Sequence, residues 1–300
     1  MKEKETLARK GLAAAFEAFA VAETPARRIG AQMLAQDVLR ELPADMEPPA
    51  FRRALGVSYL AGVNTSKKIA KGSKLSFDTL VLYLAASNNA GVDVCSHATT
   101  GCRLACLVGS GNALMEERAG LLGIVRSRIL KTWGAVWRPD LFNRALQSEI
   151  DRAKAKAKRA GRGFAVRLNG TSDLDFSALI AANPDVQHYD YTKDPRRQSA
   201  DNYHLTFSFG KDSPARNRHL RQALRRGQKI AIPVVAADVK AALELPETLD
   251  FDETDLRFLD GPGKYGILKV KQTSNTSEGV RNGFVLDLAG LKELIRKLES

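Results

Sequence analysis

The chemistry in this chain is concentrated in its cysteines, because all three lie within a segment of twelve residues. The segment reads Cys95-Ser-His-Ala-Thr-Thr-Gly-Cys102-Arg-Leu-Ala-Cys106, with six residues between the first two cysteines and three between the last two. Thiolates are soft ligands that suit iron–sulfur clusters, zinc and copper. Three of them on one loop can hold three irons of a cubane cluster and leave the fourth iron open to a small ligand. We therefore predict that Cys95, Cys102 and Cys106 bind an iron–sulfur cluster of the 4Fe-4S type.

Alternatives to the cluster stay open at this point. A structural zinc site would take His97 as the fourth ligand beside the three thiolates, although zinc-binding cysteines are usually separated by about two to four residues. Inert buried thiols are a further alternative. A radical S-adenosylmethionine enzyme offers the same three thiolates and open iron, but most such enzymes space their cysteines as C-x3-C-x2-C. The odd number of cysteines argues against a framework of disulfides.

The cysteine loop needs a scaffold, and the apolar residues predict one of helices and strands. Residues 1–55 have the spacing of two helices, with a break at Pro25 and with Pro43, Pro48 and Pro49 ending the second helix. Farther along the chain, short apolar runs alternate with helical segments, which favours parallel strands joined by right-handed crossovers. The predicted strands are residues 79–85, 164–168, 186–191, 203–209, 229–235, 256–259 and 266–270. The predicted helices are residues 114–159 with a break near Pro139, 177–182, 215–226 and 288–298.

These elements predict an α/β protein with a complete or partial (β/α) barrel-like parallel sheet, because about seven strands alternate with helices. An open doubly wound sheet is the alternative. We expect a helical N-terminal extension over residues 1–55. The chain has no internal repeat and no low-complexity linker, so we expect one α/β domain over residues 56–300 that carries the cysteine loop.

Polar side chains follow the predicted strands at the points where they end. In parallel α/β folds, ligand sites gather at the carboxyl ends of the strands. The cysteine loop also follows a strand, so we expect it to meet these polar residues at one rim. The predicted cofactor-binding residues, for S-adenosylmethionine if the chain uses it, are Asn169, Thr171, Ser172, Asp173, Asp190, Lys193 and Ser208. The same residue types serve turns and helix caps, and capping is the favoured interpretation for Asp173.

Five blocks of sequence carry a resemblance to a known family. They are the cysteine loop, Val166-Arg-Leu-Asn-Gly-Thr-Ser-Asp173, Tyr189-Asp-Tyr-Thr-Lys193, Tyr203-His-Leu-Thr-Phe-Ser208 and Leu256-Arg-Phe-Leu-Asp260. In these blocks the chain resembles the phage-encoded proteins described as gene-product-88-like, from about residue 62 to about residue 285. The resemblance implies a phage origin and an iron–sulfur site on a barrel-like α/β fold, but no reaction. The chain departs from many relatives in having Leu107-Val108 after the last cysteine.

The formal net charge is +12, from 46 Lys and Arg against 34 Asp and Glu. A surplus of this size attracts polyanions, of which nucleic acid is the commonest. We expect two basic segments to contact phosphates with little sequence preference. Their residues are Lys154, Lys156, Lys158 and Arg159 in the first and Arg216, Arg218, Arg221, Arg225 and Arg226 in the second. For either segment taken alone, a solvent-exposed helix face with no ligand is favoured over a phosphate-binding surface.

The sequence also excludes some classes of protein. No segment approaches the run of about 20 apolar residues that a membrane span needs, and the N-terminus lacks the features of a signal peptide. We therefore expect a protein of the host-cell cytoplasm with no membrane partner. Walker-type and G-x-G-x-x-G loops are absent. Three functions fit: a phage-encoded iron–sulfur protein that acts on or binds nucleic acid, a radical S-adenosylmethionine-type enzyme, and a zinc-stabilised structural or host-interaction protein.

Overall fold

The computed structural model describes residues 2–104, 106, 123–210, 216–270 and 282–300. The chain starts with three helices: α1 (Lys2–Ala20), α2 (Pro25–Arg40) and α3 (Pro48–Leu55). The Thr24 hydroxyl caps α2 by accepting from the Arg27 amide at 3.4 Å. The prediction of two helices missed α3. Pro48 and Pro49 begin this helix, where proline's missing amide costs nothing, rather than end the helix before it.

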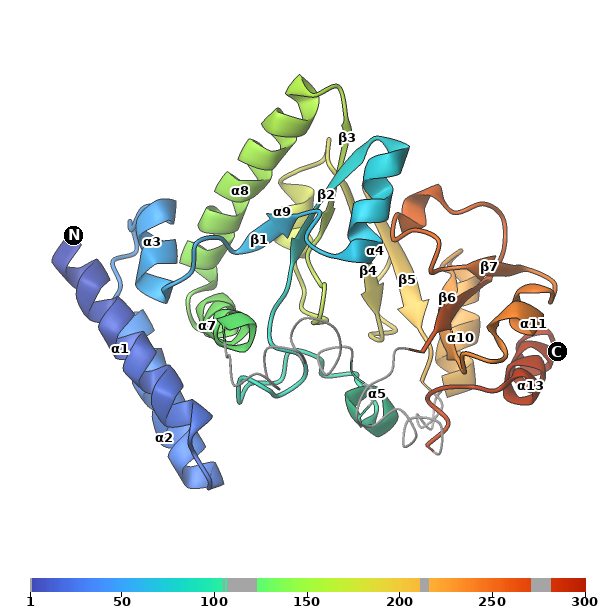
Figure 1. The fold of residues 1–300 in the computed structure, drawn as a ribbon, viewed down its shortest axis with the longest axis horizontal. Helices are drawn as coiled ribbons and strands as arrows, with labels where there is room; N and C mark the ends of the chain where they lie inside the picture. The colour runs from blue at the N-terminus through green and yellow to red at the C-terminus, as the bar shows by residue number, and fades with distance from the viewer. Residues whose placement is uncertain (1, 105, 107–122, 211–215, 271–281) are drawn as a thin grey trace.

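Eight strands form one sheet in the order β1-β2-β3-β4-β5-β6-β8-β7, in which β1 is antiparallel to β2 and the other neighbours are parallel. The strands are β1 (Ala61–Val63), β2 (Phe77–Leu82), β3 (Gly163–Arg167), β4 (Gln187–Thr192), β5 (Tyr203–Ser208), β6 (Ile230–Val234), β7 (Thr248–Asp250) and β8 (Tyr265–Lys269). From β2 to β6 each strand lies beside the next in sequence, unlike a doubly wound sheet, whose order reverses. The sheet is open, with β1 and β7 at its edges (Figure 1), so the complete barrel is not formed.

One predicted strand is wrong and two strands were missed. Residues 256–259 contain a 3-10 helix, η3 (Arg257–Leu259), which packs on the sheet. Leu256 and Phe258 pack against Ala165 and Tyr189 on the sheet surface, while Arg257 lies between them in sequence. Apolar residues two positions apart are also typical of a strand, which explains the wrong prediction. The missed strands, β1 and β7, are three residues long, too short to show an alternating pattern. The other predicted strands overlap β2 to β6 and β8.

Helices connect most of the strands, and the two predicted breaks, at Pro25 and Pro139, are confirmed. The longer ones are α7 (Gly123–Trp137), α8 (Pro139–Arg159), α10 (Arg216–Arg225) and α13 (Leu288–Glu299), and the shorter ones are α4 (Lys67–Ala70), η1 (Lys71–Leu75), α5 (Thr100–Leu104), α9 (Ser177–Ala181) and α11 (Val239–Leu243). Pro139 separates α7 from α8 as predicted, while residues 114–122 of the predicted helix lie outside the described residues. None of the described helices is long and apolar enough to cross a membrane.

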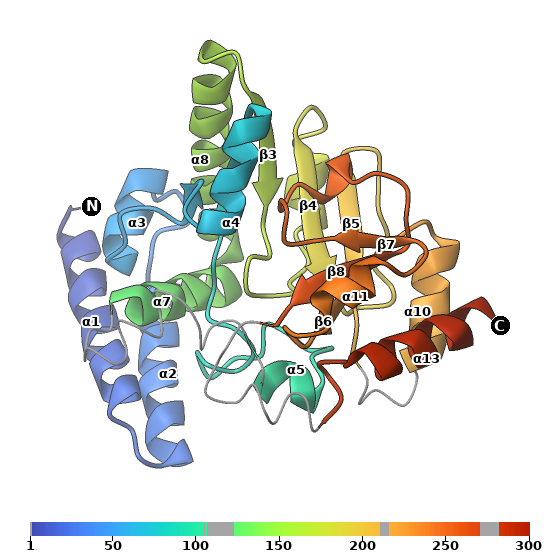
Figure 2. The same ribbon diagram turned by 45° about the vertical axis from the view of Figure 1, so that its right-hand side comes forward.

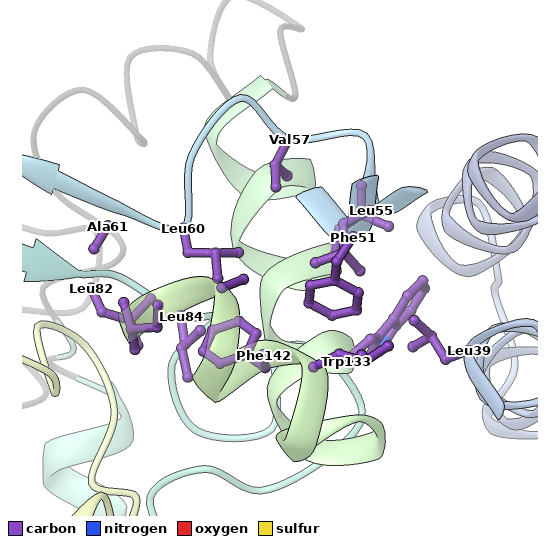
Figure 3. Close-up of a cluster of buried hydrophobic side chains, with 14 of the residues drawn as sticks. Leu39, Phe51, Leu55, Val57, Leu60, Ala61, Leu82, Leu84, Trp133 and Phe142 are labelled. Carbon is purple, nitrogen blue, oxygen red and sulfur yellow. The ribbon is translucent and has the colours of Figure 1, made fainter. Parts of the chain in front are cut away.

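The N-terminal helices share one apolar core with α7, α8 and the sheet. Trp133 of α7 is fully buried in this core, near Phe51 and Leu39 (Figure 3). Its ring lies 5.7 Å from that of Phe19 in an edge-to-face arrangement, and its Nε1 donates to the carbonyl of Ala90 at 2.9 Å. The N-terminal helices are therefore held on the α/β part by shared burial, which is the largest stabilising contribution available to them.

The sheet has two different faces. On the helix-covered face, Val166 of β3 and Leu205 of β5 join the main core with α8 and α9. On the opposite face, which we call the inner face, Tyr189 of β4 lies under Leu256. Because side chains of a strand alternate, sequence neighbours such as Tyr189 and Asp190 lie on opposite faces.

Candidate functional site

The cysteine loop lies at the carboxyl end of the sheet, where the sequence placed it, against the loop that follows β3. The amide of Asp173 donates to the carbonyl of Val94 at 2.8 Å, and Cys95 Sγ is 3.8 Å from the carbonyl oxygen of Thr171. In Figure 1 the arrowheads of β4 and β5 point toward the end of the molecule that carries α5. The loops that follow β2 and β3 therefore form one rim.

The three thiols are half-buried, and Cys102 and Cys106 lie near enough to Cys95 to affect the charge of its thiol. Cys102 lies in α5 and Cys106 just beyond it. Burial raises the pKa of the Cys95 thiol to about 12, although the Ser87 amide, which donates to its sulfur at 3.4 Å, opposes this shift. Negative charge on Cys102 or Cys106 raises that pKa further. A thiolate at Cys95 therefore needs a positive charge beside it.

Arg103, between the last two cysteines, supplies such a charge and ties the loop together. Its Nη2 donates to Asp93 Oδ2 at 2.9 Å and to the carbonyl of Cys95 at 3.2 Å, and its Nη1 donates to the Ser87 hydroxyl. The hydrogen bond to Asp93 raises the pKa of Arg103, and so does negative charge on Cys95 and Cys102. Sequence analysis missed Arg103, for which the only signal was a cation between two predicted metal ligands.

The thiols of the loop are ligand types found both in zinc sites and in iron–sulfur clusters. Around one zinc ion the ligand atoms lie about 2.0–2.3 Å from the metal. Within the described ranges, no group of three or more His, Cys, Asp or Glu side chains is arranged to hold a metal ion. In a cubane cluster each thiolate binds a different iron, so the sulfurs lie farther apart. Three thiolates, a backbone amide donating to one sulfur and a neighbouring arginine are suitable surroundings for such a cluster.

His97, the fourth ligand of the zinc alternative, faces a small pocket at the rim. Its Nδ1 lies 3.1 Å from Ser96 Oγ, and its Nε2 lies 3.8 Å from a carboxylate oxygen of Asp194. The pocket has a volume of about 30 Å³, room for one water-sized group, and is lined by His97, Thr99, Lys193, Phe207, Ser208, Gly210, His219 and Leu220. Two predicted cofactor-binding residues, Lys193 and Ser208, are therefore beside the cysteine loop.

Three other predicted cofactor-binding residues bond mainly to one another. Asp190 Oδ1 accepts from the Asn169 amide at 2.8 Å, and its Oδ2 accepts from Asn169 Nδ2 and from the Tyr203 hydroxyl, both at 3.2 Å. Asn169 Oδ1 accepts from the Ser172 hydroxyl at 2.9 Å. Burial raises the pKa of Asp190 to about 6, and the positive charge of Arg197 opposes this. These contacts hold the loop after β3 in place, and a contact with a cofactor stays a prediction.

Asp173 is not a helix cap, so the favoured interpretation of this residue is wrong. The residue at the cap position of α9 is Phe176, which makes no side-chain cap bond. Asp173 instead links two rim loops. Its Oδ2 accepts from the Lys193 amide at 2.8 Å and from the Thr192 hydroxyl at 3.1 Å, and its Oδ1 accepts from Arg197. An aspartate in a turn accepts hydrogen bonds from donors that the fold brings near, and for Asp173 these donors lie at the end of β4.

The two basic segments form separate surfaces. The basic end of α8 lies by the start of β3, away from α5, whereas α10 lies beside α13 (Figures 1 and 2). Lys154 pairs with Asp185, and Arg221 and Arg226 donate to backbone carbonyls. The side chain of Arg216 lies outside the described part of the structure. The basic side chains that stay exposed are Lys156, Lys158, Arg159, Arg218 and Arg225.

Comparison with known proteins identifies a family for most of the chain. The family model described as Gene product 88 matches residues 59–285. No curated protein and no solved structure matches. The matched range holds the three cysteines and all eight strands, and it leaves out the helices α1 to α3.

Proposed function

The chain belongs to the gene product 88 family, and from that premise we propose that it is a phage-encoded protein that binds a 4Fe-4S cluster through Cys95, Cys102 and Cys106. The observation that carries the proposal is the meeting of three thiols on one rim loop beside Arg103, where Cys102 and Cys106 lie close enough to Cys95 to affect the charge of its thiol. When bound, such a cluster supplies a redox centre and an open iron. We also propose a cytoplasmic location, because reducing conditions there keep thiols free of disulfides.

The residues around the thiols have separate tasks in this proposal. The amide of Ser87 donates to the sulfur of Cys95 and orients it. Arg103 offsets the negative charge that the thiolates bring into a half-buried site, and it braces the loop through Asp93. The rim loops that enclose Cys95 restrict the access of water to its sulfur.

Metal analysis of anaerobically purified protein tests the proposal directly. We expect about four irons and four sulfides per chain. Changing any one of the three cysteines to serine removes most of both, while the neighbouring Ser96→Ala variant, which leaves all three thiols in place, keeps them. Zinc without sulfide contradicts the cluster and selects the zinc-stabilised structural alternative.

Arg103 offers a second test with a readout beyond cluster content. Removing the positive charge in Arg103→Gln makes the addition of an electron less favourable, so we expect a lower reduction potential. The Arg103→Lys variant keeps the charge and restores most of the potential, although it loses part of the bracing. Equal potentials in wild type and Arg103→Gln contradict an electrostatic role for this residue.

A second candidate function is a radical S-adenosylmethionine-type enzyme, supported by the polar side chains of the strand ends beside the cysteine loop. His97 of the loop and Lys193 and Ser208 of the strand ends line the small rim pocket together, so a ligand of the open iron would meet polar side chains. Addition of S-adenosylmethionine to the reduced protein tests the candidate by spectroscopy. An unchanged cluster spectrum eliminates it.

We further propose that the exposed end of α8 contacts nucleic acid, supported by the net charge of +12 and by Lys156, Lys158 and Arg159, which are exposed on one helix. Replacing all three by glutamine should weaken binding to a random duplex and flatten its salt dependence, by a slope change of about 2–3. The matched control is Lys154→Gln on the same helix, because Lys154 already pairs with Asp185. Equal losses in the two variants contradict a specific role for the exposed end.

A further inference from the structure

A group of polar atoms on the inner face of the sheet is buried without hydrogen-bond partners among the described residues. They belong to neighbouring strands β3, β4 and β5 and to the segment around η3. The atoms are Arg167 Nε, the Tyr191 hydroxyl, His204 Nε2, Thr206 Oγ1, Arg257 Nε and Nη1, and Asp260 Oδ2. Buried polar groups in folded proteins nearly always have partners, so a cluster of exceptions needs an explanation.

These side chains lie together on one face. Tyr191 pairs in register with Thr206, so their side chains are adjacent on the same side of β4 and β5. The Arg167 guanidinium lies 4.8 Å from the centre of the Tyr191 ring. The charges of Arg257 and Arg167 both act on Tyr191, and the charge of Arg257 also acts on His204. The six side chains are therefore one cluster.

Both guanidinium groups are anchored on one side and left unpaired on the other. Arg167 Nη1 donates to Asp255 Oδ2 at 2.8 Å, and Asp255 is itself held by the Tyr189 hydroxyl at 3.2 Å. Arg257 lies 3.9 Å from the centre of the Phe251 ring and 3.4 Å from Asp260 Oδ1. Such anchoring fixes the directions of the remaining N–H groups before a ligand arrives.

The chemistry of the unpaired atoms selects an anionic ligand. The two guanidinium groups can only donate, and the hydroxyls and imidazole can donate as well. Two fixed guanidinium groups with neighbouring hydroxyls match the oxygens of a phosphate group. Two carboxylates, Asp255 and Asp260, would oppose an anion, but each is offset by two cations. Asp255 pairs with Arg167 at 2.8 Å and with Lys68 at 3.5 Å. Asp260 lies 3.4 Å from Arg257 and is also under the positive charge of Lys229.

We propose that the inner face of β3, β4 and β5 binds the phosphate group of a small molecule through Arg167, Tyr191, Thr206 and Arg257. Thr206 and Arg257 are fully buried, so a nucleic-acid backbone does not reach them. Arg167 keeps 14% of its side chain exposed and Tyr191 is half-buried, and both lie near the carboxyl ends of their strands. The two most accessible side chains of the cluster therefore lie at the end of the sheet that carries the cysteine loop. It goes beyond the proposed cluster and does not depend on it.

Calorimetric titration of the full chain with inorganic phosphate and with pyrophosphate tests the site. We expect saturable binding at one site, weakened roughly 10- to 100-fold by Arg167→Gln and roughly 3- to 10-fold by Tyr191→Phe. Thr206→Val, which keeps the shape and removes only an unpaired hydroxyl, should fold normally and weaken binding by a similar factor of roughly 3 to 10. The matched control is Tyr265→Phe, which removes an unpaired buried hydroxyl from the helix-covered face of β8.

Several outcomes overturn the proposal. They are the absence of saturable binding at about 1 mM phosphate or pyrophosphate, an equal loss of affinity in Tyr265→Phe, and displacement of phosphate by a short DNA duplex. Binding that disappears when the protein is purified without iron also overturns it, because the site is proposed to be independent of the cluster. Equal binding with and without iron supports the site even if the cysteines prove to bind another metal.

Discussion

The two faces of strands β3, β4 and β5 differ in whether their buried polar groups have hydrogen-bond partners. On the helix-covered face Asp190 accepts three hydrogen bonds, and Arg197 contacts both Asp173 and Tyr203. On the inner face Thr206 and Arg257 are equally buried, yet atoms of both have no partner among the described residues. The first face uses polar groups to fix the loops of the rim. On the inner face, donors and acceptors remain unpaired and could bind a ligand.

The helix-covered face has two exceptions, His188 and Tyr265, whose buried polar atoms also lack partners in the described part of the chain. They lie on β4 and β8, which are separated in the sheet by β5 and β6. Single unpaired groups of this kind cost stability but form no site, because a ligand needs several converging donors. It is the clustering on the inner face, rather than any one unpaired atom, that distinguishes the two faces.

The largest expected effect compares Arg197, whose side chain is 12% exposed, with the fully buried Arg257. Arg197→Met should lower the free energy of unfolding by about 3–5 kcal/mol, because it leaves Asp173 and the Tyr203–Asp190 pair without their cation. Arg257→Met should cost about 1–2 kcal/mol less, since two of its nitrogens have no acceptor to lose, although Asp260 loses its cation at 3.4 Å. Urea denaturation at neutral pH measures both. Equal costs would mean that the faces do not differ as described.

The pH dependence of stability tests His188, one of the two exceptions on the helix-covered face. Burial lowers the pKa of His188 to about 4, from about 6.5 in the unfolded chain. The unfolded state therefore binds more protons, and stability that is complete above pH 6.5 is lost as the pH falls toward 4. Asp190, with a folded pKa raised to about 6, acts in the opposite direction over this range.

We expect His188→Leu to reduce the loss of unfolding free energy between pH 7 and pH 4.5 by about 2 kcal/mol relative to wild type. Denaturant titrations at the two pH values measure this loss, and because Asp190 is present in both proteins its opposing contribution cancels. An unchanged loss would show that His188 does not stay neutral in the folded protein.

The smallest effect comes from two buried threonines on adjacent strands. Thr192 donates to Asp173 at 3.1 Å and accepts from the Asp194 amide at 3.0 Å, so Thr192→Val should destabilise the protein by about 1–2 kcal/mol. Thr206→Val should be neutral or stabilising by up to about 1 kcal/mol, because its hydroxyl has no partner to lose. Thermal unfolding of the two variants gives the signs. Destabilisation by both would indicate that Thr206 also has a partner in the unliganded protein.

Much of the fold followed from the sequence because it depends on local pattern. The break at Pro139, the helix over residues 215–226 and the strand over residues 203–209 depend on apolar spacing and proline, and the structure has these elements close to their predicted bounds. The cysteine loop was found because three cysteines lie within twelve residues, and its place at the rim followed from the strand before it. The third helix, α3, was missed because a proline can end one helix or begin the next.

What the tertiary structure decided is which polar residues are already paired. Asp190 and Tyr191 are neighbours in sequence, and both have polar side chains. The alternation of side chains along β4 places Asp190 in a hydrogen-bond network on one face and Tyr191 among unpaired atoms on the other. Arg167 and Arg257 come from segments ninety residues apart, and no local pattern relates them. The sequence by itself determined the elements and the thiol loop, since these are local properties of the chain. Only folding determines which donors and acceptors meet, because hydrogen bonding depends on distances that the order of residues does not contain.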